Sequence, residues 1–591
     1  TILRNYHRDV LALKRRITFK GVDVLVQELE DDLHASLHDP RSDAVSGVED
    51  IAGRLLAIRD ILAREHQSLY LDLLDDLIHK VQLFGIHFAA LDIRQDSRVH
   101  AAALEAVSAR HPELFGGRRY AELDEAEKAA RLGALTGDVD PATIEDELAR
   151  RTLESVRAMK TIQERNGEKG CHRYIISNSG SAVDVLAAFA LIRLSGWDRP
   201  SVDIIPLFET VDDLQVAETV MESLYTDPEY AAHLKRRGDR QCIMLGFSDG
   251  TKDGGYLMAN WSIYTAKERL TAVARKFGVH VVFFDGRGGP PARGGGKTHQ
   301  FYASLGPTIE HHEVQLTIQG QTISSNFGTP ESCQYNLEQL LSSGIDNAVF
   351  PDAGNELPPA DRETMDRLAT ASSRAYSDFK AHPKFMPYLE RMSTLKYYAK
   401  TNIGSRPAKR GSGDELEFSD LRAIPFVGSW SQLKQNVPGF FGVGTALEAM
   451  KTAGEFDRVR SLYGNSAFFR ALIENSMMSL SKSFFPLTAY MKEDPEFGGF
   501  WTLIFEEYER SKALILEITG YSELMEDSKA MRASIAVREQ IVLPLLTIQQ
   551  YALREIQRRR AAGADQAELE IWEKIVTQSL FGNINASRNS A

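Results

Sequence analysis

The stretch Cys242-Ile-Met-Leu-Gly-Phe-Ser-Asp-Gly-Thr-Lys-Asp253 decides the fold of this chain, because an apolar run passes directly into charged and small residues. A short apolar run bounded by turn residues is typical of a strand buried on both faces of a parallel sheet. The carboxylates and the lysine that follow would then lie where the strand ends. We therefore predict a strand over residues 242–247 with chemically active residues immediately after it.

Similar apolar runs lie on both sides of this stretch. We predict further buried strands over residues 174–177, 203–208, 280–284 and 314–318, and helices over 182–194, 213–224 and 256–276. Strands that recur every roughly 30–40 residues with helices between them are the signature of βαβ units and a parallel sheet. The pattern predicts an α/β fold, either a barrel or a doubly wound sheet.

The sequence on either side of this core is helical. Apolar residues recur at three- and four-residue spacing from residue 1 to about 160, and helical patterns return from about 331 to the end, interrupted at 402–425. We predict three regions: a helical region with the first elements of the core at 1–170, the α/β core at 171–330, and a C-terminal helical region at 331–591.

Composition excludes several classes of protein. The 591 residues include 69 Lys and Arg against 82 Asp and Glu, a net charge of −13, which argues against a protein that neutralises duplex phosphates. The three cysteines are isolated, which excludes a cysteine zinc site and fits a reducing cytoplasm. No apolar run approaches the ~18 residues of a membrane span. We therefore expect a cytoplasmic protein with no nucleic-acid and no membrane partner.

Three consecutive predicted strands end in charged residues. Glu209 follows the first, Asp249 and Lys252 follow the second, and Asp285-Gly-Arg287 follows the third. The carboxyl ends of parallel strands share one edge of a sheet, and in a barrel this edge carries the active site. The alternative is that the charged residues only solvate strand ends, which is a weaker explanation for three strands in a row.

The third strand end continues into a basic, glycine-rich segment, Asp285-Gly-Arg-Gly-Gly-Pro-Pro-Ala-Arg-Gly-Gly-Gly-Lys-Thr-His299. Glycines permit close backbone approach, and two arginines and a lysine supply donors for phosphate or carboxylate oxygens. The spacing matches neither the Rossmann nor the Walker loop. The segment is interpreted as an oxyanion cradle, with a solvated surface loop as the alternative.

Candidate metal ligands and further arginines complete the set. Glu209 and Asp249 are hard oxygen ligands, which suit Mg²⁺ or Mn²⁺ better than zinc. Arg422 lies among apolar neighbours and needs an anionic partner, either a ligand or a structural carboxylate, while Arg94 lies in another mixed segment near the amino end. Together these residues suit a small substrate with several negative charges.

These residues resemble the phosphoenolpyruvate carboxylase family. Ile243-Met-Leu-Gly-Phe-Ser-Asp-Gly-Thr-Lys-Asp-Gly-Gly255 is similar to the lysine signature of that family. The resemblance continues in order over essentially the whole chain, through Leu91-Asp-Ile-Arg-Gln-Asp-Ser97, Pro206-Leu-Phe-Glu-Thr210, Gly286-Arg-Gly-Gly289, Gly404-Ser-Arg-Pro-Ala-Lys-Arg410, Leu421-Arg-Ala-Ile-Pro425 and Arg588-Asn589.

The resemblance implies a TIM-like α/β barrel embedded in a predominantly helical protein that assembles as a homotetramer, a dimer of dimers. It implies the carboxylation of phosphoenolpyruvate by bicarbonate to oxaloacetate and phosphate, an anaplerotic carbon dioxide fixation that supplies the tricarboxylic acid cycle. The reaction passes through carboxyphosphate and an enolate. The enzyme would be a carboxy-lyase, and its C-terminal region would complete the active site.

The resemblance also implies roles for individual residues. Glu209 and Asp249 would bind Mg²⁺ or Mn²⁺. The catalytic set would consist of Lys252, Arg94, Arg287, Arg406 and Arg422. An allosteric site for an inhibitory dicarboxylate would consist of Arg293, Lys482, Arg538 and Asn589.

Two departures from the family pattern affect these expectations. Asp285 stands where the family usually has His, and we expect this carboxylate to weaken phosphate binding unless it pairs with an arginine or the cation. The family's second signature, Thr-Ala-His-Pro-Thr-Glu, which carries a catalytic histidine, does not occur in the sequence.

Three hypotheses follow. The first is a divergent bacterial-type phosphoenolpyruvate carboxylase represented by its carboxy-terminal two-thirds, in which this chain alone lacks the histidine-bearing segment and has no activity. The second is a short homologue, regulatory or inactive, that binds phosphoenolpyruvate without carboxylating it. The third is a different phosphoenol-using barrel, such as a lyase or phosphotransferase, for which only His299 is available near the glycine-rich segment.

Overall fold

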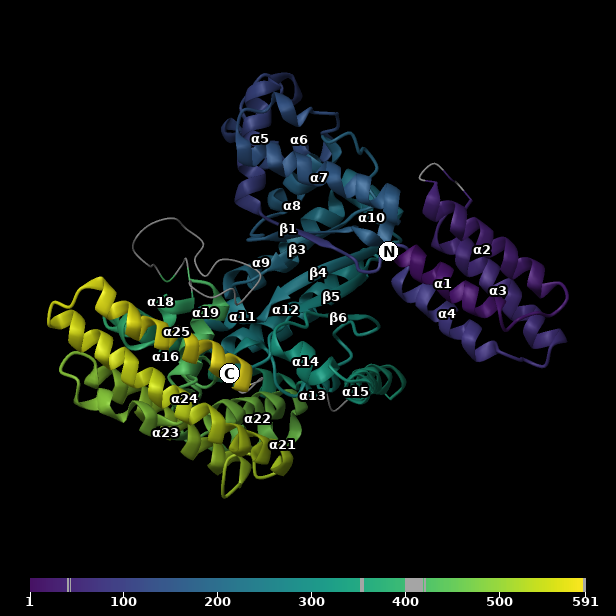
Figure 1. Cartoon of the computed structure of the whole chain (residues 1–591). Helices are drawn as coiled ribbons and strands as arrows, with labels where there is room; N and C mark the ends of the chain where they lie inside the picture. The colour runs from purple at the N-terminus through teal and green to yellow at the C-terminus, as the bar shows by residue number, and fades with distance from the viewer. Residues whose placement is uncertain (40–41, 43, 351–355, 399–417, 419–420, 588–591) are drawn as a thin grey trace. The chain divides into compact units, whose positions relative to one another are not determined.

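The computed structural model describes residues 1–39, 42, 44–350, 356–398, 418 and 421–587 (Figure 1). The chain divides into two compact units, which are described separately. Unit 1 comprises Thr1–Pro206 and Thr226–Gly238, and unit 2 comprises Leu207–Tyr225 and Asp239–Ala591.

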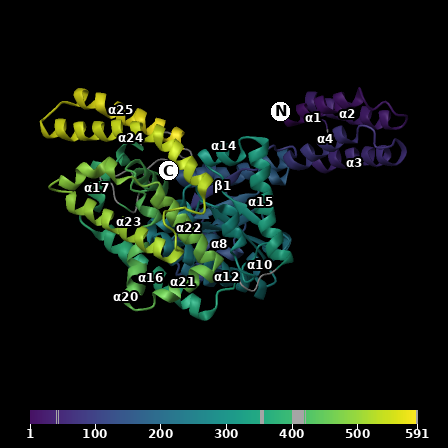
Figure 2. The ribbon, with the colours of Figure 1, turned by 90° about the horizontal axis from the view of Figure 1, so that it is seen from below.

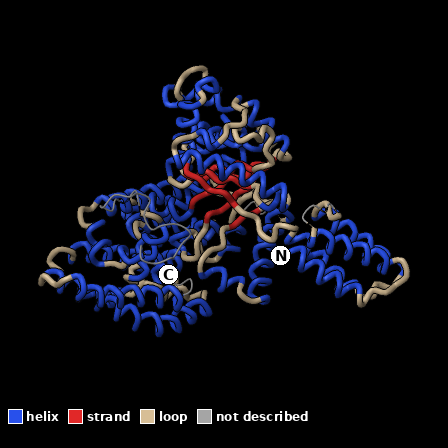
Figure 3. Tube along the Cα trace, turned by 45° about the horizontal axis from the view of Figure 1, so that its top comes forward, coloured by secondary structure: helices blue, strands red, loops and turns tan. Residues whose placement is uncertain are grey.

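The strands, drawn in red in Figure 3, form a sheet. It is parallel, and its strands follow chain order, β1-β2-β3-β4-β5-β6. Their bounds are Asp92–Asp96 (β1), Arg173–Ser177 (β2), Asp203–Phe208 (β3), Arg240–Gly246 (β4), His280–Gly286 (β5) and Val314–Leu316 (β6). Among the described residues β1 pairs only with β2, and β6 only with β5, so the sheet is open. The predicted α/β class is confirmed, and the closed barrel stays a prediction.

The described residues of unit 1 contain β1, β2, the first residues of β3, and nine α-helices: α1 (Ile2–Lys14), α2 (Val22–His38), α3 (Val48–Glu65), α4 (Leu71–Phe84), α5 (Ser97–Arg110), α6 (Glu125–Ala134), α7 (Glu147–Asn166), α8 (Ala182–Arg193) and α10 (Pro228–Arg236). Helices α1 to α4 pack side by side around a shared apolar core (Figure 1). In α4 the residues at helical spacing, Leu74, Leu77, Ile78 and Val81, are at most 3% exposed. The predicted helical character of the first 160 residues is confirmed.

Unit 2 contains the last two residues of β3, the strands β4 to β6, and most of the remaining helices. They are α9 (Val211–Thr226), α11 (Phe247–Gly254), α12 (Tyr256–Lys276), α13 (Thr298–Ala303), α14 (Gln321–Phe327), α15 (Pro330–Val349), α16 (Pro359–Ala381), α17 (Phe385–Met392), α18 (Leu395–Tyr398), α19 (Ala423–Gln432), α20 (Val443–Thr452), α21 (Phe456–Asn465), α22 (Ala467–Ser481), α23 (Gly498–Thr519), α24 (Lys529–Ala561) and α25 (Gln566–Ser587).

Aromatic side chains fill the core of unit 2. Phe379, Trp430 and Phe500 are at most 3% exposed, and the rings of Phe379 and Phe500 stack with centroids 5.2 Å apart. Such pairs add about 0.5–1.5 kcal/mol beyond the area they bury. Helices α24 and α25 lie side by side (Figure 2) and share a second apolar core with Tyr397 and Tyr398. None of the helices in the described part of the chain combines the length and apolar composition that crossing a bilayer requires.

The structure differs from the sequence prediction at two elements. Residues 92–96 form β1, which the sequence does not indicate, because a strand that pairs on one side only needs few apolar residues. The residues after β4 do not form a loop: Phe247–Gly254 is the helix α11. Asp249 therefore lies in the first turn of a helix and Lys252 in its last turn, where acidic and basic residues complement the helix dipole.

Candidate functional site

The register of the sheet in unit 2 brings three of the predicted strand ends level with one another. Phe208 pairs with Leu245, and Leu245 pairs with Asp285. Glu209, α11 and Arg287 therefore leave the sheet at the same edge, which is the carboxyl edge that binds ligands in parallel α/β proteins.

Glycines allow these strand ends to approach each other closely. A Cβ atom on Gly246 would lie 3.1 Å from the Cα of Glu209, and one on Gly286 would lie 3.0 Å from the carbonyl oxygen of Leu245. Both contacts involve backbone atoms, which cannot turn away as a flexible side chain can. A larger residue at either position would therefore push the strand ends apart.

Arg287 is the most enclosed cation of the predicted site. Its side chain is 4% exposed, and its guanidinium carbon lies 4.3 Å from the ring centroid of Phe301, 5.2 Å from that of Phe247 and 5.6 Å from that of Tyr302. Among the described residues, its Nε and Nη1 atoms have no hydrogen-bond partner. A buried guanidinium without an anion is unfavourable, so these donors fit a bound phosphate or carboxylate.

Arg293 holds the glycine-rich segment against α11. Its Nε donates to the hydroxyl of Ser248 at 3.2 Å. Burial lowers the pKa of Arg293 to about 10, an effect that the neighbouring Asp249 carboxylate opposes. The sequence interpretation assigned Arg293 to an inhibitor site. Ser248 belongs to the helix that carries the candidate metal ligand, and the inhibitor role of Arg293 stays a prediction.

The backbone of the same segment folds back on itself. The amide of Gly288 donates to the carbonyl of Arg293 at 2.6 Å, and the amide of Gly295 donates to that of Pro290 at 2.9 Å. At the far end, the ammonium group of Lys297 lies 3.2 Å from Glu474. These contacts make the segment a packed turn, which differs from the solvated loop considered as the alternative.

The candidate metal ligands lie next to each other along this edge. Glu209 directly follows β3, and its carbonyl oxygen would lie 3.4 Å from a Cβ atom on Gly250, the residue after Asp249. Both carboxylate side chains are partly buried. The described residues contain no group of three or more His, Cys, Asp or Glu side chains arranged to hold a metal. A cation at this place would take its remaining ligands from substrate and water oxygens.

Lys252 and Arg422 come from α11 and from the residue that precedes α19, two helices that pack together. The ammonium group of Lys252 lies 4.5 Å from the ring centroid of Phe418. Arg422 is partly buried between Leu421 and Ala423, which are 2% and 5% exposed. The expectation that Arg422 lies in an apolar setting is confirmed.

Among the other predicted residues, Arg94 is an exposed residue of β1, in unit 1. Arg406 and Asn589 lie outside the described residues, so their predicted roles stay predictions.

Lys482 and Arg538, two residues of the predicted inhibitor site, lie close enough for their charges to interact. Burial, followed by repulsion from Lys434 and Arg538, lowers the pKa of Lys482 to about 7. Lys434 is paired with Glu539 at 2.6 Å. Lys482 also lines a pocket with Pro290, Pro291 and Ala292, the residues that precede Arg293. Sequence reasoning missed Lys434 and Glu539, which no local pattern connects to Lys482.

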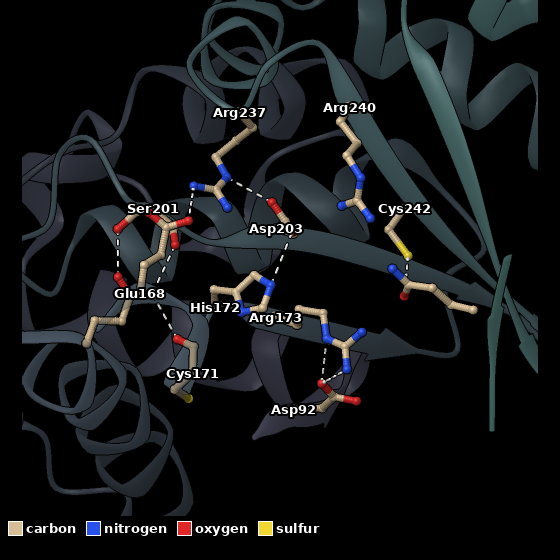
Figure 4. Close-up of polar contacts among 12 residues, drawn as sticks. Asp92, Glu168, Cys171, His172, Arg173, Ser201, Asp203, Arg237, Arg240 and Cys242 are labelled. Carbon is tan, nitrogen blue, oxygen red and sulfur yellow. Dashed lines mark hydrogen bonds and ion pairs between the residues drawn. The ribbon is translucent and has the colours of Figure 1, made fainter. Parts of the chain in front are cut away.

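A separate polar cluster in unit 1 lies at the amino ends of β2 and β3 (Figure 4). Asp203 accepts a hydrogen bond from Arg237 at 2.8 Å, and Arg237 reaches Glu168 at 2.7 Å. The ring of His172 lies 3.9 Å from Asp203. These side chains pair with one another at the amino ends of the strands, the edge opposite to the one that usually carries an active site. We therefore interpret the cluster as structural.

Asp285 does not behave as the sequence suggested. Its side chain is fully buried and pairs with Lys267 of α12 at 2.7 Å, a partner other than the arginine or the metal cation that the sequence analysis named as possible exceptions. The hydroxyl of Tyr302 donates to the same carboxylate oxygen. The carboxylate is therefore neutralised within the protein, and the expected weakening of phosphate binding loses its cause.

The fold and the site define an α/β protein with a buried arginine that can receive an anion at the carboxyl edge of a parallel sheet. The family model of phosphoenolpyruvate carboxylase matches residues 8–587, and the chain belongs to this family.

Individual relatives agree with this assignment. The chain is similar to the phosphoenolpyruvate carboxylases of Corynebacterium diphtheriae (33% identity over 90% of the chain), Nitrosomonas eutropha (32% over 90%) and Rhodothermus marinus (31% over 99%). It spans 60%, 58% and 63% of the length of these relatives, respectively.

Proposed function

We propose that this protein acts as a phosphoenolpyruvate carboxylase, a carboxy-lyase that joins bicarbonate to phosphoenolpyruvate and releases oxaloacetate and phosphate. Family membership supports the reaction. The observation that carries the proposal is Arg287, a buried guanidinium with open donors at the carboxyl edge of the sheet.

The side chains at this edge match the charges that the reaction develops. When a bicarbonate oxygen attacks phosphorus and the enolate leaves, negative charge grows on the phosphoryl oxygens and on the enolate oxygen. Arg287 would donate to the phosphoryl group, and Lys252 and Arg422 would add positive charge beside it. Donors that are already in place cost no reorganisation during the reaction, and removing one such donor typically lowers kcat by about 10²–10³-fold.

A divalent cation fits Glu209 and Asp249. Two hard carboxylates with few protein ligands suit Mg²⁺ or Mn²⁺, which usually keep water and substrate oxygens in their coordination shell. When bound, such a cation polarises substrate oxygens as a Lewis acid. Arg293, beside Asp249, and the packed glycine-rich turn would keep water from the reactive carboxyphosphate and enolate.

The test is an oxaloacetate assay with bicarbonate and either Mg²⁺ or Mn²⁺, combined with calorimetric titration of phosphoenolpyruvate. The assay is run on residues 1–591 and on a version extended upstream of Thr1, and we expect bicarbonate-dependent product from the form that carries the histidine-bearing signature. Lys252→Met and Arg287→Gln should each lower kcat/KM by about a hundredfold. Lys276→Met, which removes an exposed lysine from the far end of α12, is the matched control and should leave kcat/KM unchanged.

The outcomes separate the hypotheses. Binding of phosphoenolpyruvate without oxaloacetate would replace the proposal with a homologue that binds the substrate and does not carboxylate it. Product without any need for bicarbonate would indicate another phosphoenol-using enzyme. If neither binding nor product is detected with either metal, the proposed function is wrong.

Four wider expectations belong to the same proposal. The sheet would be part of a TIM-like barrel, the protein would form a homotetramer, and it would act in the cytoplasm with phosphoenolpyruvate and bicarbonate as its partners. Arg293, Lys482, Arg538 and Asn589 would bind an inhibitory dicarboxylate. Light scattering tests the assembly, since a mass other than four times that of the chain would contradict the tetramer.

A further inference from the structure

The ion pair Lys267–Asp285 lies near the same aromatic rings as Arg287. The mechanism proposed above assigns no role to this pair. Its side chains are 1% and 0% exposed, with the ammonium group 2.7 Å from a carboxylate oxygen. Replacing a buried ion pair with apolar residues is often neutral or stabilising, so stability alone is a poor reason for such a pair. The position of the pair near Arg287, a candidate catalytic residue, suggests a functional reason for it.

Asp285 is connected to Arg287 through the backbone. The carbonyl oxygen of Asp285 accepts hydrogen bonds from the amide of Arg287 at 2.9 Å and from the amide of Thr317 at 3.0 Å. Asp285 precedes Arg287 by two residues, and the hydrogen bond from Thr317 fixes the backbone of Asp285 to the residues that follow β6. Its side chain is the anion nearest to Arg287 in sequence.

Lys267 and Arg287 share the same aromatic neighbours. The ammonium group of Lys267 lies 5.7 Å from the ring centroid of Phe301 and 5.5 Å from that of Tyr302. The guanidinium of Arg287 lies 4.3 Å and 5.6 Å from the same two rings. Both buried cations therefore pack against one pair of aromatic rings, and the Tyr302 hydroxyl of that pair donates to the Asp285 carboxylate.

The Oδ2 atom of Asp285 is held by Lys267, while its Oδ1 atom has no hydrogen-bond partner among the described residues. One carboxylate oxygen takes both the Lys267 ammonium and the Tyr302 hydroxyl, and the structure shows no ion pair between Asp285 and Arg287 among the described residues. As a result, the Nε and Nη1 atoms of Arg287 keep their hydrogen-bonding capacity.

We propose that Lys267 is a positioning residue that holds the Asp285 carboxylate away from Arg287, so that the guanidinium stays available for the phosphoryl group of the substrate. This inference rests on the proposed function for its substrate, but its structural basis can be tested without turnover. Tyr302 assists by orienting the same carboxylate.

The test compares four variants with the unmodified protein. In Lys267→Met the carboxylate loses its partner and turns to Arg287, so we expect the KM for phosphoenolpyruvate to rise by about tenfold to a hundredfold, the cost of losing hydrogen bonds to a charged group. In Lys267→Met/Asp285→Asn no charge competes for Arg287, and KM should return to within about threefold of the original. Lys267→Arg keeps the ion pair and should change KM little. Lys276→Met, an exposed lysine of the same helix, is the control.

Crystal structures of Lys267→Met and the double variant give a readout that does not depend on activity. We expect an Asp285–Arg287 ion pair in the single variant and none in the double variant. The proposal is overturned if Asp285 remains apart from Arg287 in the single variant, or if KM in all variants simply follows the melting temperature. If the unmodified protein shows no activity, the structures still decide the role of Lys267, while the proposed function fails separately.

The same geometry reverses one expectation from the sequence. Asp285→His, which restores the residue usual in the family, would leave the Lys267 ammonium buried without its anion beside Arg287. We therefore expect this single substitution to impair the protein, and Asp285→His/Lys267→Gln to impair it less in both KM and thermal stability. An improvement in the single variant would contradict the assigned role of Lys267.

Discussion

At the scale of single residues, the environment of each cation decides what it can do. Arg287 is enclosed by aromatic rings, and two of its nitrogen atoms have no hydrogen-bond partner in the part of the chain that the structure describes. Arg293 is bonded to Ser248. Lys482 is buried among other cations. The sequence shows three basic residues, but only the tertiary structure shows how deeply each is buried and what each contacts.

Lys482 yields a pH-dependent prediction. Because burial and nearby cations lower its pKa to about 7, the ammonium form is lost as the pH rises through 7. A bound dicarboxylate favours the charged form, so its affinity should fall by up to about tenfold per pH unit above pH 7. Calorimetry with a four-carbon dicarboxylate from pH 6.5 to 8.5 measures this change.

The variant Lys482→Gln supplies the control for that titration. It should bind the dicarboxylate weakly and show little change with pH over the same range. An unmodified protein whose affinity stays constant from pH 6.5 to 8.5 would show that Lys482 does not contact the ligand.

At the scale of elements, the glycine-rich turn after β5 depends on the absence of side chains. A Cβ atom on Gly295 would lie 1.8 Å from the carbonyl oxygen of Gly289. That oxygen belongs to the backbone of the same turn, so the turn must open to admit the extra atom. Arg293, which the turn carries, would then move away from Ser248.

We therefore expect Gly295→Ala to lower kcat/KM by about a hundredfold, the size of effect that a displacement near 1 Å can have in an active site. Some loss of melting temperature should accompany it, because Ala292 of the same turn belongs to the aromatic core of unit 2, so the kinetics are measured well below the unfolding midpoint. Gly344→Ala is the matched control, because a Cβ atom there meets no other atom within 4 Å. Equal kinetic effects of the two substitutions would refute this account.

At the scale of the whole molecule, unit 1 depends on histidines that must stay neutral. Burial lowers the pKa of His100 to about 4, and burial followed by repulsion from Arg236 and Arg237 lowers that of His233 to about 4. His100 is hydrogen-bonded to the hydroxyl of Tyr174 at 2.9 Å, which links α5 to β2. The unfolded chain takes up these protons near pH 6.5, whereas the folded unit does not.

The sign of the pH effect follows. The stability that these histidines support is complete above pH 6.5 and declines as the pH falls toward 4, by about 1.4 kcal/mol per pH unit for each histidine. Hydrogen exchange of peptides from α5 and β2 should therefore speed up between pH 6.5 and 4 relative to peptides of α23. His100→Gln should reduce this acceleration, whereas His79→Gln, at an exposed position, should not. Equal acceleration in both variants would exclude His100 as the cause.

Much of the fold could be predicted from the sequence, because buried strands and amphipathic helices leave a local pattern. The apolar runs at 203–208 and 280–284 coincide with β3 and β5, and the helix predicted at 256–276 is α12. β1 was missed because an edge strand needs little apolar character. α11 was missed because it has only eight residues and two of them, Gly250 and Gly254, have a low helix propensity.

The sequence by itself determined the parallel α/β class and the charged residues that follow β3, β4 and β5, since both depend on periodicity along the chain. Only the tertiary structure decided which charges neutralise each other. Lys267 lies within the apolar pattern of α12, 18 residues before Asp285, and it becomes the partner of that carboxylate because α12 packs on β5. Burial makes an unpaired charge so unfavourable that packing, and not the order of residues along the chain, selects the pairs.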